Sequence, residues 1–395
     1  MLSTGSTDLH SAPAALRPGL EGVVLSETHL SEVDGDAGRL VLGGFPLEEL
    51  VGRASFEEVV ALLWTGSVSA GGLLREELSA HRELSEATLE LIDRAVAGGS
   101  RAIDVLRLAL DSLSLDPAVA RAARGDALAP APLILAKLPG IVAAEARRRR
   151  SLEPLPPRPE LGLAADFLAR HDGEKPSAAR VRALEDYLIA VIDHGLNAST
   201  FAARVVTSTA ADLVSALVAA VGALSGPLHG GAPGPALDLV REIGSPDRAE
   251  TVLRRKLRAG ERLMGFGHRV YRVRDPRAAA LAAAADRLAD SVGDRTLVDL
   301  VRHVEEVAVE LLDERKPDRR LRANVELYTA LLLDSLGLDT DTFTPVFAMA
   351  RAAGWIAHCR EQAEGGRLIR PRLRYAGPRD RRFGTAPARS AGSAI

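Results

Sequence analysis

Three histidines lie in settings where an imidazole can act on a ligand. His268 belongs to GFGHRVYRVRDPR (265–277), a stretch with two glycines and four arginines. Gly265 and Gly267 expose backbone N–H groups without side-chain obstruction, as an anion-binding loop requires. The spacing fits neither GxGxxG nor GxxxxGK[ST], so Rossmann and P-loop sites are excluded. A nucleic-acid arm, another phosphate-binding loop and a small carboxylate site all use such residues.

The other two histidines lie in connections between expected helices. His194 is in VIDHGLNAST (191–200), and His229 is in SGPLHGGAPGPALDLV (225–240), where glycines let a ligand approach the backbone closely. A capping histidine and a plain helix-joining loop are the structural alternatives. The three histidines show no HxH or HExxH spacing and have no cysteine nearby, so no metal site is expected.

The chain reads mainly as helices. Apolar residues recur at three- and four-residue spacings in FEEVVALLW (56–64), LEDYLIAVI (184–192) and ADLVSALVAAVGAL (211–224), which predicts a helix in each. Another helix is expected to begin near Pro233 or Pro235, because proline suits the first helical turn.

Capping residues predict where two further helices begin. Asn197 or Ser199 can cap a helix that runs toward Val221. Asp275 suits an N-cap, with Pro276 at the first helical position.

Strand-like alternation is convincing only in VVLSET (23–28) and RLVLGG (39–44), which the turn residues DGDAG (34–38) separate. One small hairpin before a helical body is therefore expected. The basic run Arg147–Arg150 is expected to be a solvated helix end.

Composition limits the class of protein. The chain has 395 residues, enough for two domains, and a formal net charge of −3 that argues against a general nucleic-acid binder. Its one cysteine, Cys359, fits a reducing cytoplasm. No secretory signal is seen in residues 1–18, and the longest apolar run (213–224) is too short to span a bilayer. The tail from Gly377 onward is expected to be disordered.

Taken together, six stretches resemble the citrate synthase family in content and order, over roughly residues 19 to 375. They are LEGVVLSETHLSEVDGDAGRLVLGGFPLEEL (20–50), DHGLNASTFAARVV (193–206), GPLHGGA (226–232), MGFGHRVYRVRDPR (264–277), ANVELYTALLLDSLG (323–337) and LIRPRLRY (368–375).

The resemblance implies an all-α homodimer whose subunits each have two domains, with the active site between them. Residues 1–225 and 336–395 would form the large domain, and residues 226–335 the small one. The implied reaction is condensation of acetyl-CoA with oxaloacetate and water to citrate and CoA. A coenzyme A thioester is the substrate, and no further cofactor, nucleic acid or membrane is implied.

The implied catalytic residues fit that chemistry. A thioester α-proton is poorly acidic, so its removal needs a base together with a donor to the enolate oxygen. By motif match, His229 is that donor and Glu326, which follows Asn324-Val325, is the base. His268 would donate to the oxaloacetate carbonyl as it becomes an alkoxide, while His194 would orient and polarise that carbonyl.

The resemblance also assigns the arginines that hold the two carboxylates of oxaloacetate. Bidentate guanidinium groups are suited to this task. Arg277 would bind one carboxylate. Arg351, in MARAAGW (349–355), and Arg370, reaching across from the partner subunit, would bind the other.

Coenzyme A is assigned to the same glycine-containing stretch. Met264, Gly265, Phe266 and Gly267 fall where the family places the adenine, and Arg272 falls where it places a CoA phosphate. Arg269 and Arg274 are expected to be solvated.

Three positions depart from the family pattern. Glu326 stands where the family usually has aspartate, and its extra methylene moves the carboxylate by about 1.5 Å. Gly195 follows His194 where many relatives have glutamate, and Pro233-Gly234 replace a commoner Asn-Glu. Two alternatives therefore stay open: 2-methylcitrate formation from propionyl-CoA, and a weakly active or non-catalytic ligand-binding paralogue.

Overall fold

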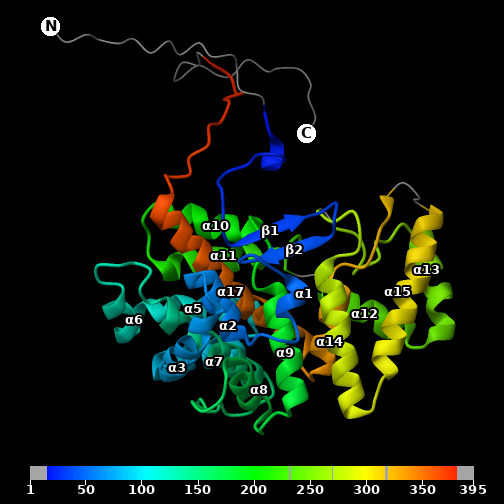
Figure 1. The fold of residues 1–395 in the computed structure, drawn as a ribbon, viewed down its shortest axis with the longest axis horizontal. Helices are drawn as coiled ribbons and strands as arrows, with labels where there is room; N and C mark the ends of the chain where they lie inside the picture. Colours follow the sequence, from blue (N-terminus) through cyan, green and yellow to red (C-terminus); the bar gives the residue numbers. More distant parts are fainter. Residues whose placement is uncertain (1–15, 231–232, 269, 316–318, 380–395) are drawn as a thin grey trace.

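The computed structural model describes residues 16–230, 233–268, 270–315 and 319–379. Within these ranges the chain is built of helices, with one small sheet near its start (Figure 1). The all-α expectation is confirmed. The first eight helices are α1 (Leu47–Leu50), α2 (Phe56–Thr65), α3 (Gly71–Ala80), α4 (Glu86–Ala97), α5 (Ala102–Ser112), α6 (Pro117–Ala122), α7 (Ala131–Arg149) and α8 (Leu163–Asp172). The others are α9 (Ala178–Val191), α10 (Ala198–Thr207), α11 (Leu213–Leu224), α12 (Pro233–Ile243), α13 (Ala249–Arg258), α14 (Pro276–Val292), α15 (Thr296–Arg315), α16 (Val325–Ser335) and α17 (Thr340–Gly365).

The sheet differs in part from its prediction. Its antiparallel strands are β1 (Ser31–Asp34), β2 (Arg39–Leu42) and β3 (Phe45–Pro46), in the order β1-β2-β3. The expected turn and second strand are present, but the first strand is β1 and not residues 23–28. The tight turn is the reason, because Asp34 caps it by accepting the N–H groups of Asp36 and Ala37 and pairs directly with Arg39.

The helix expected from Asn197 toward Val221 is also divided. Asn197 does cap α10, accepting the N–H of Thr200, but α10 ends at Thr207. Ala210 then adopts a left-handed conformation, with φ at +62°. Asp212 caps α11 by accepting the N–H of Ser215, so a second capping residue starts a new helix.

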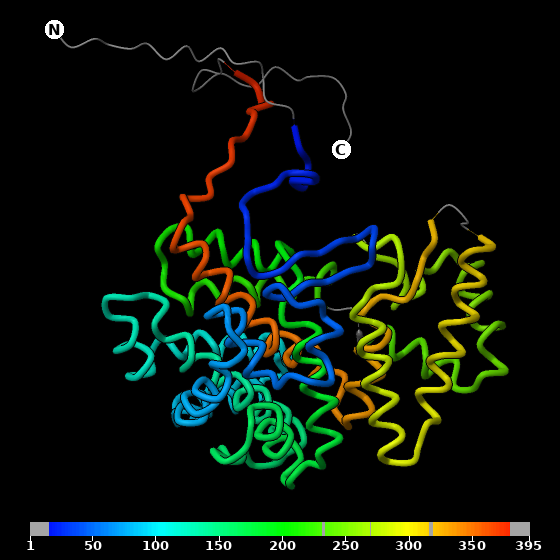
Figure 2. The backbone as a smooth tube through the Cα atoms, in the orientation of Figure 1, coloured from blue at the N-terminus to red at the C-terminus, as the bar shows by residue number. Residues whose placement is uncertain are grey.

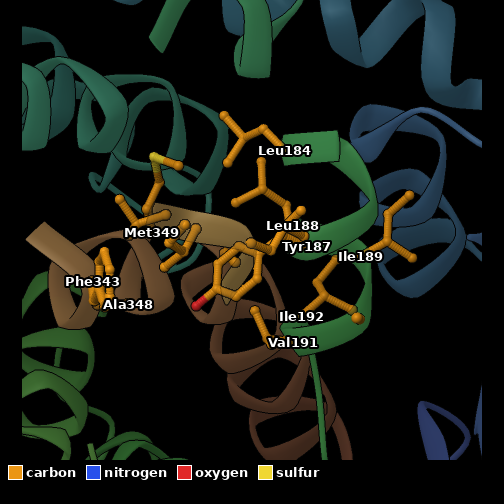
Figure 3. Packing of buried hydrophobic residues seen from close by; sticks show 14 of the residues in the cluster. Leu184, Tyr187, Leu188, Ile189, Val191, Ile192, Phe343, Ala348 and Met349 are labelled. Carbon is orange, nitrogen blue, oxygen red and sulfur yellow. The ribbon is translucent and has the colours of Figure 1, made fainter. Parts of the chain in front are cut away.

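The larger group of helices consists of α1–α11 and α17. Helix α17 forms its centre. It is buried along most of its length, and Trp355 is its largest fully buried side chain. Figure 3 shows Leu184 and Tyr187 of α9 packed with Phe343 and Met349 of α17. A helix that is apolar around most of its circumference has to be buried. Its polar residues therefore lie inside the protein, where they can hold other groups.

Helices α12, α13, α14 and α15 lie together on the other side of the molecule (Figure 1). Helix α16 packs against α14 and α12, and α14 also packs along α9. Asp275 caps α14, with Pro276 at its first position, as the sequence predicts. The residues that bear the predicted chemistry come from both groups of helices.

The β1–β2 turn contacts the loop that follows His268. Gly35 accepts the N–H of Arg272 through its carbonyl oxygen, at 2.9 Å. A Cβ at Gly35 would lie 2.3 Å from the carbonyl oxygen of Val270, so only glycine permits this approach. The hairpin therefore supports this loop from outside.

The segments that precede β1 and follow α17 extend away from the helices (Figure 2). Apart from a short 3-10 turn at Pro18–Leu20, they have no regular secondary structure. Apolar side chains on them are exposed, with Val24 at 87% and Leu373 at 100%. The predicted disordered tail falls largely on residues 380–395, outside the described residues.

Candidate active site

His194 lies in the turn between α9 and α10. Gly195 beside it has φ at +58°, a left-handed conformation that suits glycine. The Nε2 atom of His194 is 3.1 Å from the hydroxyl of Tyr271. Burial, with the charges of Arg277 and Arg351, lowers the pKa of His194 well below its usual value. The ring is therefore neutral at pH 7.

His229 lies in the connection between α11 and α12. Its Nε2 atom accepts the backbone N–H of Ser199 at 3.3 Å, and the Ser199 hydroxyl is 2.8 Å from the same nitrogen. Burial and the charge of Arg351 lower the pKa of His229 to about 4. A neutral ring that accepts at Nε2 carries its proton on Nδ1, which leaves Nδ1–H as a donor.

His268 is held by the loop that it begins. Its Nδ1 atom accepts the N–H groups of Val270 and Tyr271, at 3.0 and 3.1 Å. Burial and the charge of Arg277 lower the pKa of His268 to about 4. The neutral ring therefore carries its proton on Nε2. Its centroid is 5.7 Å from that of His194, so two neutral imidazoles face one region.

Arg277 is buried in the first turn of α14. It donates to both carboxylate oxygens of Asp275, at 3.0 and 2.7 Å, and its Nη2 atom is 3.4 Å from Nε2 of His268. Burial lowers the pKa of Arg277, but Asp275 more than offsets this and raises it. The guanidinium is thus charged and fixed beside the imidazoles.

Arg351 is a buried cation on α17, with 2% of its surface exposed. Its Nε atom donates to the carbonyl of Val191 at 2.5 Å, and its guanidinium carbon lies 4.6 Å from the ring centre of Phe347. Burial lowers its pKa to about 10. Within the described ranges no carboxylate lies within ion-pairing distance of it, so it is suited to receive an anionic ligand.

Glu326 lies in the first turn of α16, whose N-cap is Asn324. Burial raises the pKa of Glu326 to about 7; Asp275 acts in the same direction, while Arg277 and Arg351 oppose it. A carboxylate with a pKa near the working pH is suited to take and return a proton. The Glu326 side chain, although longer than the usual aspartate, is thus close enough to Arg277, Asp275 and Arg351 for their charges to affect its pKa.

The loop from Met264 to Gly267 is joined to the start of α16. Phe266 and Ala323 form an antiparallel bridge, and the Asn324 N–H donates to the Gly265 carbonyl at 2.9 Å. Gly265 and Gly267 have φ at +88° and +85°, so both need glycine.

Arg272 is exposed and lies farther along the same loop. Its Nε atom is 3.1 Å from a carboxylate oxygen of Asp36 in the β1–β2 turn. Arg274 is exposed, as expected, and also pairs with Glu305 at 2.9 Å, while Arg269 lies outside the described residues.

Arg370 is the one predicted site residue that the described chain does not bring to this region. It is exposed in the segment after α17, which runs away from the helices (Figure 2). The other predicted residues lie in the site itself or on the loop of residues 264–272 beside it.

Sequence reasoning missed Tyr271 and Ser199 as supports of the site. Tyr271 contacts His194, and Ser199 contacts His229. Their places three and five residues after a candidate histidine are the only signal in the sequence.

The residues described above lack two further features. They contain no group of three or more His, Cys, Asp or Glu side chains that could hold a metal ion. None of their helices is long and apolar enough to cross a membrane.

Comparison with known proteins identifies the arrangement. A family model described as citrate synthase, C-terminal domain, matches residues 19–372. The chain belongs to the citrate synthase family. It is therefore an enzyme of the citrate synthase type, which condenses an acyl-CoA with oxaloacetate.

Relatives from this family cover almost the whole chain. A citrate synthase of Haloferax volcanii is 40% identical over 93% of this chain and 97% of its own length. A 2-methylcitrate synthase of Mycobacterium tuberculosis is 38% identical over 96% of both chains. The citrate synthase structure from Pyrobaculum aerophilum, 34% identical, superposes with a TM-score of 0.85 over 97% of this chain and 98% of that one.

Proposed function

We propose that this citrate synthase family enzyme uses acetyl-CoA, with Glu326 as base and His229 and His268 as donors. Glu326 removes a methyl proton from the thioester, and Nδ1–H of His229 donates to the enolate oxygen. The carbon nucleophile then attacks the keto carbon of oxaloacetate. Water finally cleaves the thioester, giving citrate and the free thiol of CoA.

The fixed tautomer of His268 is the observation that carries this proposal. Its Nδ1 atom accepts two backbone N–H groups, so Nε2 carries the ring proton. Nη2 of Arg277, 3.4 Å from Nε2, is also a donor, so a ligand oxygen can accept from both. In the proposed step His268 donates to the keto oxygen as that oxygen becomes an alkoxide. A donor fixed in advance where negative charge develops lowers the barrier most effectively. His194 would orient the same carbonyl, with Tyr271 holding its ring.

Arg277 and Arg351 would bind the two carboxylates of oxaloacetate. Both are buried, and Arg351 has no carboxylate in contact within the described part of the chain. Arg370 of the partner subunit would complete the clamp. The exposed apolar residues Val24 and Leu373 support a homodimer, since a second subunit would cover them.

Coenzyme A would rest its adenine against Met264, Gly265, Phe266 and Gly267 and place a phosphate at Arg272. Asp36 would release Arg272 when the phosphate arrives. Residues 226–335 would move as a small domain toward residues 1–225 and 336–395. Oxaloacetate would bind first and draw this domain inward. We place the enzyme in the cytoplasm, where its single thiol stays reduced.

Propionyl-CoA is the second candidate substrate, favoured by the relative named 2-methylcitrate synthase. One methylene in an apolar pocket changes specificity by only about 1–3 kcal/mol. Thiol release from acetyl-CoA and from propionyl-CoA, with and without oxaloacetate, tests both candidates. Oxaloacetate-dependent release that is faster with acetyl-CoA is expected, and faster release with propionyl-CoA would replace acetyl-CoA by propionyl-CoA in the proposal.

Glu326→Asp and Glu326→Gln complete that experiment. We expect Glu326→Gln to lose at least about 100-fold in kcat, since the base is removed. Activity in Glu326→Asp but not in wild type would show that the carboxylate of Glu326 stands out of reach. Inactivity of all three proteins would favour a non-catalytic ligand-binding role.

A further inference from the structure

The turn that carries His194 rests directly on α17. A Cβ at Gly354 of α17 would lie 2.2 Å from the carbonyl oxygen of Ile192. One turn earlier, Arg351 donates to the carbonyl of Val191. The backbone that leads into His194 is therefore pressed against a buried helix, and no side chain separates the two.

The carboxylate of Asp193, the residue before His194, is completely buried. Its Oδ2 atom accepts the Ser31 hydroxyl at 2.5 Å and the Gly195 N–H at 3.2 Å. Its Oδ1 atom lies 3.1 Å from Nε2 of His358 on α17. Contacts on both oxygens fix the conformation of this residue and hence the direction of the next side chain.

His358 is itself fixed from the opposite side. It is buried, and its Nδ1 atom accepts from Nη1 of Arg204 at 3.0 Å. Arg204 also donates to Glu361 at 2.7 Å and to Gln362 at 3.2 Å. A guanidinium can only donate, so Nδ1 of His358 is the acceptor and Nε2–H points to Asp193. Neither nitrogen is left for a substrate.

We propose that His358 is a positioning residue, which holds the ring of His194 at oxaloacetate through the carboxylate of Asp193. The proposal rests on the proposed function, in which His194 orients the oxaloacetate carbonyl. His358 transmits an interaction from Arg204 to Asp193, because it accepts with one nitrogen and donates with the other. A side chain that does both is needed between a buried cation and a buried carboxylate.

Glutamine is the side chain that imitates this pattern. Its amide oxygen can accept from Arg204 while its amide N–H donates to Asp193. Leucine fills a similar volume and does neither. Gln362→Leu is a matched control, because it removes another contact of Arg204 on the same buried helix without touching Asp193.

The test measures oxaloacetate binding by calorimetry, together with KM for each substrate, in the full-length protein. We expect His358→Leu to raise both the dissociation constant and KM for oxaloacetate about 10–100-fold, the usual effect of losing such an orienting partner. KM for acetyl-CoA should change less than about threefold, while His358→Gln and Gln362→Leu should stay within about threefold of wild type for both substrates.

A double-mutant cycle with His194→Ala separates positioning from a general structural role. If His358 acts through His194, His358→Leu adds little in the His194→Ala background, because the two effects are not additive. Thermal unfolding checks that each variant is folded. If His358→Leu does not fold, His358→Asn replaces it, since its amide is one methylene too short to reach both partners.

Three results would overturn the proposal. They are unchanged oxaloacetate binding in folded His358→Leu, a glutamine variant no better than leucine, and full additivity with His194→Ala. Failure of the proposed function gives a different result, because wild type itself would then neither bind oxaloacetate nor release thiol.

Discussion

The side chains of the candidate site divide into two sets that are supported in different ways. The core-supported set consists of His194, His229 and Arg351. The loop-supported set consists of His268, Arg277 and Glu326. Both sets face the same region, yet the contacts that hold them join very different parts of the chain.

The core-supported set depends on contacts between residues far apart in sequence. Arg351 donates to Val191, 160 residues away, and Trp355 donates to Ser199, 156 residues away. These contacts are buried and all involve α17. The core-supported set is therefore formed as soon as the larger group of helices packs.

The loop-supported set is held mainly by near neighbours. His268 accepts from residues two and three positions ahead, and Arg277 pairs with Asp275 two positions behind. The N–H of Glu326 donates to Asn324, also two positions behind. These contacts move with the loop. In the proposed function, the buried helices hold one half of the site fixed, while the loop-supported set, together with the segment that carries His229, would shift toward it.

The largest expected effect comes from removing a donor of the loop-supported set. His268→Ala should lower kcat about 10²–10³-fold, because the alkoxide loses its hydrogen bond. Initial rates with both substrates at saturation measure this. A loss smaller than about fivefold would mean that another group stabilises the alkoxide.

A second change leaves every site residue in place and disturbs only the loop. The Cβ of Gly35→Ala would meet the Val270 carbonyl at 2.3 Å and push the loop outward. A shift near 1 Å at reacting groups can cost about 10² in rate, so kcat should fall by up to that factor. Gly72→Ala, with open space around its Cβ, is the matched control. Equal kcat values in the two variants would show that the contact between the hairpin and the loop does not affect catalysis.

A smaller effect is expected when the core-supported set is weakened. Trp355→Phe removes the N–H that reaches the Ser199 hydroxyl at 3.2 Å, and Ser199 contacts His229. Loss of one such hydrogen bond should lower kcat/KM for acetyl-CoA about 2–10-fold. Trp64→Phe is the control, because it loses a bond to the Ala353 carbonyl on the same helix but none to the site. Both variants should unfold at similar temperatures if the effect is local.

The smallest expected effect is on stability, and it depends on pH. Burial raises the pKa of Glu326 to about 7, against about 4.3 in an unfolded chain. Between these values the folded protein binds more protons than the unfolded chain, so this group costs stability as pH rises. Glu326→Gln should therefore raise Tm by a few degrees at pH 8.5 and by much less at pH 4.5. An equal change at both pH values would contradict the raised pKa.

The sequence predicted the parts of the fold that depend on local chemistry. Asp275 and Asn197 cap helices as expected, and α12 begins at Pro233. The prediction of the first strand was wrong, because SEVD (31–34) lacks strand-like alternation and pairs with β2 only through the turn that follows it. A strand specified by its partner leaves little signal in its own residues.

In the candidate site, too, the sequence predicted features set by local motifs and missed those set by distant contacts. Motifs led to His194, His229 and His268, but nothing near His194 and His229 pointed to α17 as the helix that supports them. The run Arg147–Arg150 was expected to be a solvated helix end. It does end α7, and Arg150 is exposed, but Arg147 is buried and donates to the carbonyls of Glu153 and His171. Contacts that depend on distant backbone atoms cannot be seen in a local pattern.

The bridge between Phe266 and Ala323 has a consequence for how a long substrate is used. In the proposed function, the nucleotide end of the coenzyme meets the loop at Phe266, and its acyl end meets Glu326, three residues beyond Ala323. Paired backbones cannot slide independently. Binding of the adenine would therefore help to align the acyl methyl group with Glu326. A small thioester that lacks the nucleotide would thus forfeit catalytic speed as well as affinity.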